Sequence, residues 1–201
     1  MKSTASVSTT SPWTLNTRRI VTAGVLGAIT IILGIIPGLG FIPLPNLAGS
    51  ATIEHIPTIL GAVLEGPVVG MITGLVFGIT SFFHATLPLF KDPLVSVLPR
   101  IIIGLTAWLA FFSLYRFSRD VAAFVAGFIG AATNTILVLG IAVLRGYLPF
   151  KAAVLLPILP QAVIEAIIAA ILTFVIARAV YIVRGNFVRA TDTKPRDELP
   201  Y

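Results

Sequence analysis

The chain has 201 residues, of which 57% are hydrophobic and only 11% are charged. Soluble domains carry about a quarter charged residues, so this composition excludes an ordinary soluble domain and predicts an integral membrane protein. The chain has no cysteine and two histidines, which excludes disulfides, thiol catalysis and metal sites built on cysteine or histidine clusters. Most of the net charge of +6 lies beside apolar stretches, as in membrane topology signals, so nucleic-acid binding is not expected.

Six apolar segments are predicted to cross the membrane as helices, which makes the fold class all-α. A helix needs about 20 apolar residues to cross a bilayer, and several uncharged stretches exceed that length. The second segment is short and contains proline, so it is expected to start partway into the membrane beneath the loop before it. The expected spans are residues 19–36, 52–64, 67–86, 93–115, 121–144 and 153–183.

Two polar tails flank this transmembrane domain, which is expected to cover residues 18–183. The N-terminal tail, residues 1–17, has no acidic residue, and the apolar run after it is too long for a cleavable signal peptide. It is interpreted as a short cytoplasmic tail, with a transit peptide as the alternative. The C-terminal tail, residues 184–201, is charged and contains proline, which predicts disorder.

The basic residues are distributed unequally between the two ends of the predicted spans. With a cytoplasmic N-terminus, most of them lie inside, and only Lys91, Arg100, Arg145 and Lys151 lie outside. The positive-inside rule therefore predicts that both termini are cytoplasmic, which agrees with an even number of spans. The outer connections are longer or richer in proline and glycine than the inner turns, so they are expected to cover a pocket.

Small residues mark one face of the third span and one face of the first. Glycines at positions 66, 70, 74 and 78 are spaced by four, which predicts close packing against a neighbouring helix. On the first span, two interlaced pairs form a smooth face, which is interpreted either as internal packing or as a docking surface for another membrane subunit. These pairs are Ala23 with Gly27 and Gly24 with Ala28.

Polar side chains at membrane depth are the candidate site residues. A charged group there costs about 2.5–3.5 kcal/mol even on insertion scales, so it is by default a functional hypothesis. Most of these residues fall in the outer half of the spans, where they are expected to converge on one outward-facing cavity. The candidates are Glu54, His55, His84, Arg100, Asn134, Gln161 and Glu165.

Prolines accompany three of these candidates. A proline inside a helix cannot donate to the carbonyl four residues earlier. Pro57, Pro99 and Pro160 would therefore leave the carbonyls of residues 53, 95 and 156 without their helical partners. Irregular backbone at membrane depth is tolerated only where it is buried in protein or lines a watery cavity, so these prolines also favour a binding site.

Each candidate also has a purely structural interpretation. Glu54 is suited to cap the second span, and His84 to lie at the membrane interface. Arg100 has the alternative of pairing with Glu165 or Glu54, because charges inside membranes usually pair. Asp92 is interpreted as a helix N-cap before Pro93. The remaining outer charges, Lys91, Arg145 and Lys151, are expected to be solvated.

These features together resemble a known family of membrane proteins. The segments "ATIEHIPTILGAVLEGPVVGMITGLVFGITSFFHA" and "DPLVSVLPRIIIGL", the small-residue face of the first span and the polar outer pocket resemble substrate-binding S components of energy-coupling factor (ECF) vitamin transporters. The resemblance covers about residues 18–183 and extends to the pantothenate-type branch. It implies a multi-pass protein of a bacterial cell membrane.

The resemblance also implies a division of labour between subunits. The S component captures a vitamin outside, while a transmembrane coupling subunit and two cytoplasmic ATPases drive uptake. In the family, an Ala-xxx-Ala type motif on the first helix contacts the coupling subunit, which favours the docking interpretation for Ala23, Gly24, Gly27 and Ala28. The chain has no Gly-x-x-x-x-Gly-Lys-Ser/Thr loop, so ATP hydrolysis is expected to belong to the partners.

The leading functional hypothesis is therefore a vitamin-binding subunit of an ABC-type importer, with pantothenate as the first candidate and no cofactor of its own. Arg100 is expected to bind a substrate carboxylate, while Asn134, Gln161, Glu165, His55 and His84 complete the site. A hydroxymethylpyrimidine, pyridoxine or a folate-type compound remains an alternative substrate. A stand-alone transporter is a further alternative, and so is an intramembrane enzyme, although no H-E-x-x-H or G-x-S-x-G motif is present.

Overall fold

The computed structural model describes residues 11–36, 38–43, 50–151 and 156–191, and the predicted all-α character is confirmed over these ranges apart from one small hairpin. The longer helices are α1 (Thr17–Ile35), α2 (Ile56–Glu65), α3 (Pro67–Phe83), α5 (Leu98–Leu114), α6 (Arg119–Leu144) and α8 (Leu159–Thr191). The short elements are strands β1 (Phe41–Pro43) and β2 (Ser50–Thr52), helix α4 (Pro93–Ser96), and 3₁₀ turns η1 (Pro88–Lys91) and η2 (Leu156–Ile158).

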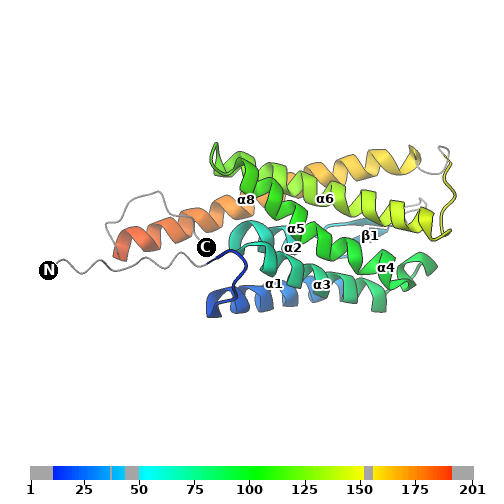
Figure 1. Ribbon diagram of the computed structural model, residues 1–201, viewed down its shortest axis with the longest axis horizontal. Helices are drawn as coiled ribbons and strands as arrows, with labels where there is room; N and C mark the ends of the chain where they lie inside the picture. The colour runs from blue at the N-terminus through cyan, green and yellow to red at the C-terminus, as the bar shows by residue number, and fades with distance from the viewer. Residues whose placement is uncertain (1–10, 37, 44–49, 152–155, 192–201) are drawn as a thin grey trace.

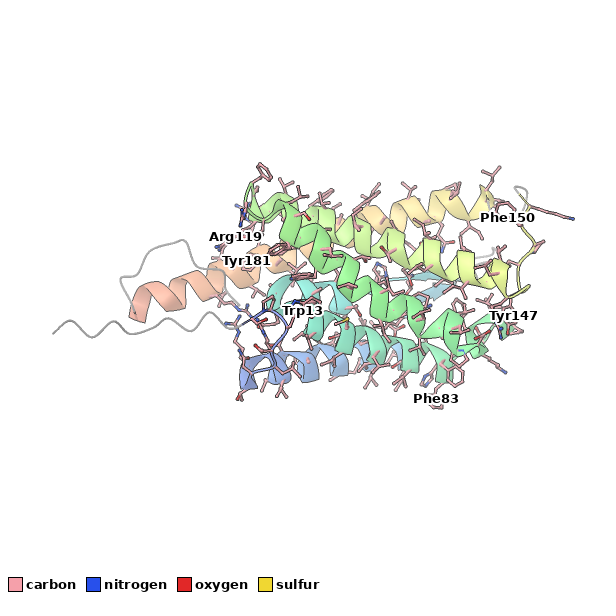
Figure 2. All side chains as sticks on the ribbon, in the orientation of Figure 1. Trp13, Phe83, Arg119, Tyr147, Phe150 and Tyr181 are labelled. Atoms are coloured by element: carbon pink, nitrogen blue, oxygen red, sulfur yellow. The ribbon has the colours of Figure 1, made fainter. Side chains whose placement is uncertain are left out.

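The long helices lie side by side in one elongated bundle (Figure 1). One end of the bundle holds the start of α1, the α2–α3 and α5–α6 turns and the end of α8, and we call it the arginine end. The opposite end holds β1, β2 and α4, and we call it the hairpin end. Figure 2 shows Arg119 and Tyr181 at the arginine end, and Tyr147 and Phe150 at the hairpin end.

Helix α2 forms the centre of the bundle. All ten of its residues are buried, and it contacts α1, α3, α5, α6 and α8. It is only 10 residues long, which is about 15 Å of helix and half of a hydrocarbon core. The two antiparallel strands precede it and pair Phe41 with Thr52. The expectation that the second segment is short is therefore confirmed, and its start partway into the membrane beneath the preceding loop stays a prediction.

The glycine face of α3 packs closely against its neighbours, as predicted. A Cβ atom at Gly70 would lie 2.7 Å from the Cβ of Ala62 on α2, and one at Gly74 would lie 2.1 Å from the carbonyl oxygen of Arg100. From the other side, a Cβ at Gly104 of α5 would lie 2.3 Å from the Gly70 carbonyl carbon. Glycine is therefore required where α3 crosses α5, since no side chain fits between the two backbones.

The predicted fourth span is interrupted near its start. Helix α4 ends at Ser96 and α5 begins at Leu98, so residues 93–115 do not form one continuous helix. Pro99 lacks an N–H group and cannot donate to the carbonyl of Val95, which explains the break at this point. The break places Arg100 in the first turn of α5, against α3.

Helix α8 is the longest element, with 33 residues, and it continues beyond the predicted limit of the domain at residue 183 as far as Thr191. Figure 1 shows this part extending past the other helices at the arginine end. Residues 184–191 are helical here, residues 192–201 lie outside the described residues, and the expectation of a disordered tail from residue 184 stays a prediction. Most of the predicted N-terminal tail, residues 1–10, also lies outside them.

Within the described part of the chain, four helical stretches are long and apolar enough to cross a membrane, namely residues 17–35, 93–114, 119–144 and 156–185. Helices α2 and α3 are apolar but shorter, at 10 and 17 residues. Six crossings with both termini in the cytoplasm therefore stay a prediction.

One buried acidic side chain ties the arginine end together. The Glu65 carboxylate, 1% exposed, forms ion pairs with Arg18 of α1 at 3.1 Å and with Arg184 of α8 at 2.5 Å. Arg184 also donates to the carbonyl of Leu64, and the Tyr181 hydroxyl donates to the carbonyl of Val63. These bonds join α1 and α8 to the end of α2. They provide partners for the buried Glu65 carboxylate and for two backbone carbonyls.

Candidate functional site

A cavity of about 70 Å³ lies at the hairpin end, between β2, η1, α5, α6 and α8. Its apolar walls include Phe90, Val138 and Leu139. Typical sites for small organic ligands enclose about 300–1,000 Å³, so the cavity is narrow in this state of the protein. Its polar lining consists of Thr52, Arg100, Asn134, Thr135, Gln161 and Glu165.

Among the described lining residues, Arg100 is the only lysine or arginine, and it is 2% exposed. Its Nη1 atom donates to the carbonyl oxygen of Val95 at 2.8 Å, which is the carbonyl that Pro99 leaves without a helical partner. The guanidinium lies between the rings of Phe77 and Phe90, with its Cζ atom 4.9 and 5.4 Å from the ring centres. Such cation–π contacts stabilise a desolvated charge.

The guanidinium has no acidic partner among the described residues. No ion pair within 4.0 Å joins Arg100 to Glu54 or Glu165, and its Nε atom makes no hydrogen bond. The alternative in which Arg100 is neutralised by one of these acids therefore finds no support in the contacts. A buried, unpaired cation is costly, and the cost is acceptable at a site whose function requires the charge.

Asn134 of α6 and the pair Gln161 and Glu165 of α8 supply the other predicted groups. The Oδ1 atom of Asn134 is buried and makes no hydrogen bond, so it is an acceptor available to a ligand. Gln161 donates to the Glu165 carboxylate at 2.6 Å, as their i, i+4 spacing on one helix face allows. The backbone N–H of Thr52 also donates to Glu165, which attaches strand β2 to α8 beside the cavity.

The hairpin end contains an ion pair that the sequence interpretation missed. Asp92 caps α4 by accepting from the N–H of Leu94 at 2.9 Å, which confirms the N-cap prediction. Its other oxygen pairs with Arg145 at the end of α6, at 2.7 Å, so Arg145 is not a merely solvated charge. The hydrogen bond from Arg145, followed by the one from Leu94, holds the pKa of Asp92 below its ordinary value.

The remaining predicted binding residues lie outside the cavity lining. His84 is exposed at the end of α3, where its Nδ1 atom lies 3.0 Å from the Thr80 carbonyl oxygen. His55 and Glu54 are buried before α2, and neither the ring nitrogens nor the carboxylate oxygens make hydrogen bonds with the residues that the structure describes. Four of the six predicted substrate-binding residues thus meet in one cavity, and contact between the two histidines and a substrate stays a prediction.

Two aromatic residues beside Arg100 were not identified from the sequence. Phe77 and Phe90 belong to different elements, α3 and η1, and an aromatic residue in an apolar chain carries no local signal of a cation contact. The position of Phe77 between Gly74 and Gly78 gave a partial signal, because the glycine face predicted the close approach of a neighbouring helix without saying which one. Phe90 depends on the folding of the α3–α4 connection.

A second hollow, of about 460 Å³, lies on the surface between α1 and α3. It is lined by all four small residues of the predicted docking face, together with apolar side chains such as Ile72 and Val76. Ala23 and Gly27 are buried toward α3, whereas Gly24 and Ala28 are exposed. Ala23 and Gly27 are thus placed as internal packing would require. Gly24 and Ala28 lie on the surface, as a docking surface would require.

A match to a protein-family model shows which family this chain belongs to. The profile described as "ECF transporter, substrate-specific component" matches residues 18–177, most of the chain. The chain belongs to this family. Members are substrate-binding subunits of membrane transporters that work with an energy-coupling module of coupling and ATPase subunits, so this S component is a membrane protein and not an enzyme.

The fold agrees with this assignment. A solved structure described as "Structure and mechanism of the S component of a bacterial ECF transporter" matches with a TM-score of 0.55 and 22% identity, covering 85% of this chain and 97% of that one. At this identity the match supports the fold alone. A comparison with curated proteins found no match. The pantothenate-type branch of the family is not supported by either comparison.

Proposed function

We propose that this S component captures a water-soluble vitamin or vitamin precursor that carries a carboxylate, with pantothenate as the first candidate. The single observation that carries the proposal is the buried guanidinium of Arg100 in the wall of the hairpin-end cavity, which forms no ion pair with any described acid. A guanidinium binds a carboxylate through two parallel hydrogen bonds, and such charge-assisted bonds are about twice as strong as neutral ones.

The other lining groups suit the rest of such a molecule. Asn134 offers an unpartnered acceptor to a hydroxyl or amide N–H, and Gln161 and Glu165 add an amide and a carboxylate on the facing helix. The cavity is smaller than a vitamin, so binding requires outward movement of its walls. The strand pair and η1 are the short elements on that side, and they contribute Thr52 and Phe90 to the lining.

The orientation and partners follow from the distribution of charge and small residues. Arg18, Arg119, Arg178 and Arg184 lie toward the arginine end, which we assign to the cytoplasm by the positive-inside rule. The hairpin-end cavity then faces outward. The exposed pair Gly24 and Ala28 in the α1–α3 hollow is the proposed contact with the coupling subunit, where small residues allow close helix approach.

A binding panel tests the function directly. Purified full-length protein in detergent is titrated with pantothenate, the primary alcohol that replaces its carboxylate, pyridoxine, a hydroxymethylpyrimidine and folate. We expect saturable binding of pantothenate and at least about tenfold weaker binding of the alcohol, because it lacks the charge-assisted pair. Equal affinity for acid and alcohol would contradict the role of Arg100, and tight binding of a neutral compound alone would contradict the carboxylate class.

A transport assay tests the subunit assignment. We expect uptake only when the coupling subunit and both ATPases are produced with this chain. Uptake by this chain alone would contradict the assignment and favour a stand-alone transporter.

A further inference from the structure

Glu54 is a buried acid close to the proposed site whose role is not explained by capping or packing. Its side chain is fully buried, and both carboxylate oxygens lack hydrogen-bond partners among the described residues. It lies just before α2, so an acid there is suited to accept a capping hydrogen bond, yet it accepts none. A carboxyl group without donors has little to stabilise its charged form except a nearby cation.

The nearby cation is Arg100. Its Nη2 atom donates to the hydroxyl of Ser81 at 3.5 Å, and the Glu54 carboxylate lies beside Thr80, the residue before Ser81 on α3. The two charged groups are therefore close enough to influence each other, although they form no ion pair. Among the described acids, Glu54 is thus a longer-range electrostatic partner of the guanidinium that is proposed to receive the ligand.

The described surroundings of Glu54 contain no second cation. On α1, Gly34 lies against the carboxylate, since a Cβ atom there would be 2.5 Å from Oε1, and Thr80 of α3 lies beside it. The titratable neighbours are His55, buried and also under the influence of Arg100, and Glu165 on α8, which already accepts hydrogen bonds from Gln161 and Thr52. Among the buried acids, Glu54 thus has the fewest partners for a negative charge.

From this arrangement we infer that Glu54 and a ligand carboxylate compete as the counter-charge of Arg100, so that an anionic ligand binds only when Glu54 carries a proton. The inference rests on the proposed carboxylate ligand and adds a coupling between anion and proton. Two carboxylates beside one buried guanidinium would repel each other in surroundings of low dielectric constant, and the acid without donors is the one that takes the proton. The proton comes from water, and no other group changes its charge.

The linkage has a definite sign. If the bound state holds one proton more than the state with ionised Glu54, affinity for the anion falls as pH rises, by up to about tenfold per pH unit. A neutral ligand does not compete with Glu54, so its affinity stays constant over the same range.

The test measures the dissociation constants of pantothenate and of its alcohol analogue for the full-length protein between about pH 6 and pH 9, a range in which the ligand stays ionised. We expect pantothenate affinity to fall at least about tenfold across this range and the alcohol affinity to stay flat. The variant Glu54→Gln removes the titrating group, so its pantothenate affinity is expected not to change with pH. A parallel fall for acid and alcohol, or a fall that persists in Glu54→Gln, would overturn the inference.

A measurement on the unaltered protein covers the case in which Glu54→Gln does not fold. Binding heats recorded in buffers of different ionisation enthalpy give the number of protons taken up, and we expect proton uptake with pantothenate and none with the alcohol at the alkaline end of the range. Pantothenate binding without pH dependence or proton uptake would refute the coupling and leave the proposed function standing. Absence of any carboxylate binding would refute both.

Discussion

At the arginine end, the buried carboxylate of Glu65 is bound by Arg18 and Arg184, whereas at the hairpin end the buried guanidinium of Arg100 has no acid within ion-pair distance. Among the described residues, Tyr181 and Arg184 donate to backbone carbonyls, whereas Glu54, His55 and Asn134 hold buried atoms without partners. The contrast concerns the Glu65 network and not the whole arginine end, because the Nε and Nη2 atoms of buried Arg19 also lack partners there. A satisfied buried network stabilises a fold, and an unsatisfied one costs stability unless a ligand completes it. We therefore propose a structural role for the Glu65 network and a binding role for the cavity at the hairpin end.

The largest effect on stability is expected from Glu65→Ala at the arginine end. Removing one member of a buried ion pair costs about 3–5 kcal/mol, and we expect about 2–4 kcal/mol here because Arg18 and Arg184 can still reach water. Denaturant or thermal unfolding measures the change, and ligand affinity of the folded fraction should stay unchanged.

The matched control for Glu65 is Asp120→Ala. The Asp120–Arg178 pair lies at the same end but is exposed on both sides, so its loss should cost no more than about 1 kcal/mol. Equal costs for the two variants, or weakened ligand binding in Glu65→Ala, would break the distinction between the two ends.

The opposite sign is expected for Asn134→Leu at the hairpin end. The change removes a buried acceptor that has no partner in the empty protein, so stability should rise by up to about 1 kcal/mol, while ligand affinity should fall about tenfold. The control is Thr173→Val on α8, which also removes an unpartnered buried oxygen but lies outside the cavity lining. Only Asn134→Leu should weaken ligand binding. An equal loss of ligand affinity in both variants would show that Asn134 has no special role in contacting the ligand.

A smaller, pH-dependent effect is expected for the ion pair at the hairpin end. The pKa of Asp92 is lowered in the folded protein from an ordinary value of 3.8, so its pair with Arg145 contributes stability above that pH and loses it as the pH falls through the folded value. Asp92→Asn should therefore lower the Tm by a few degrees near neutral pH and by less under acid conditions. A gap in Tm that stays constant with pH would contradict this assignment.

The sequence predicted the cavity lining best where the signal lies in a single residue or in residues close together in the chain. Polar residues at membrane depth identified Arg100, Asn134, Gln161 and Glu165, and Pro99 predicted the free carbonyl of Val95. It did not show that this carbonyl accepts from Arg100 itself, because the bond requires the break between α4 and α5.

Contacts between distant segments could not be predicted in the same way. The pairing of Arg145 with Asp92 and the approach of Phe90 to Arg100 depend on how the connections fold at the hairpin end. The burial of Glu65 was equally hidden, since the turn "EGP" gives no sign that α1 and α8 both send an arginine to it. The local sequence pattern predicts each helix and its polar positions. Contacts between side chains on different helices can be identified only once the helices are packed together.

The central claim, that Arg100 receives a ligand carboxylate, is tested most directly by the ratio of affinities for pantothenate and its alcohol analogue in three proteins. These are the unaltered chain, Arg100→Ala, and Arg178→Ala as an arginine control at the other end. The ratio cancels general damage to the fold, as a double-mutant cycle does. We predict a preference for the acid of at least about tenfold in the unaltered chain and in Arg178→Ala, and a ratio near one in Arg100→Ala. An acid preference that survives in Arg100→Ala would contradict the account.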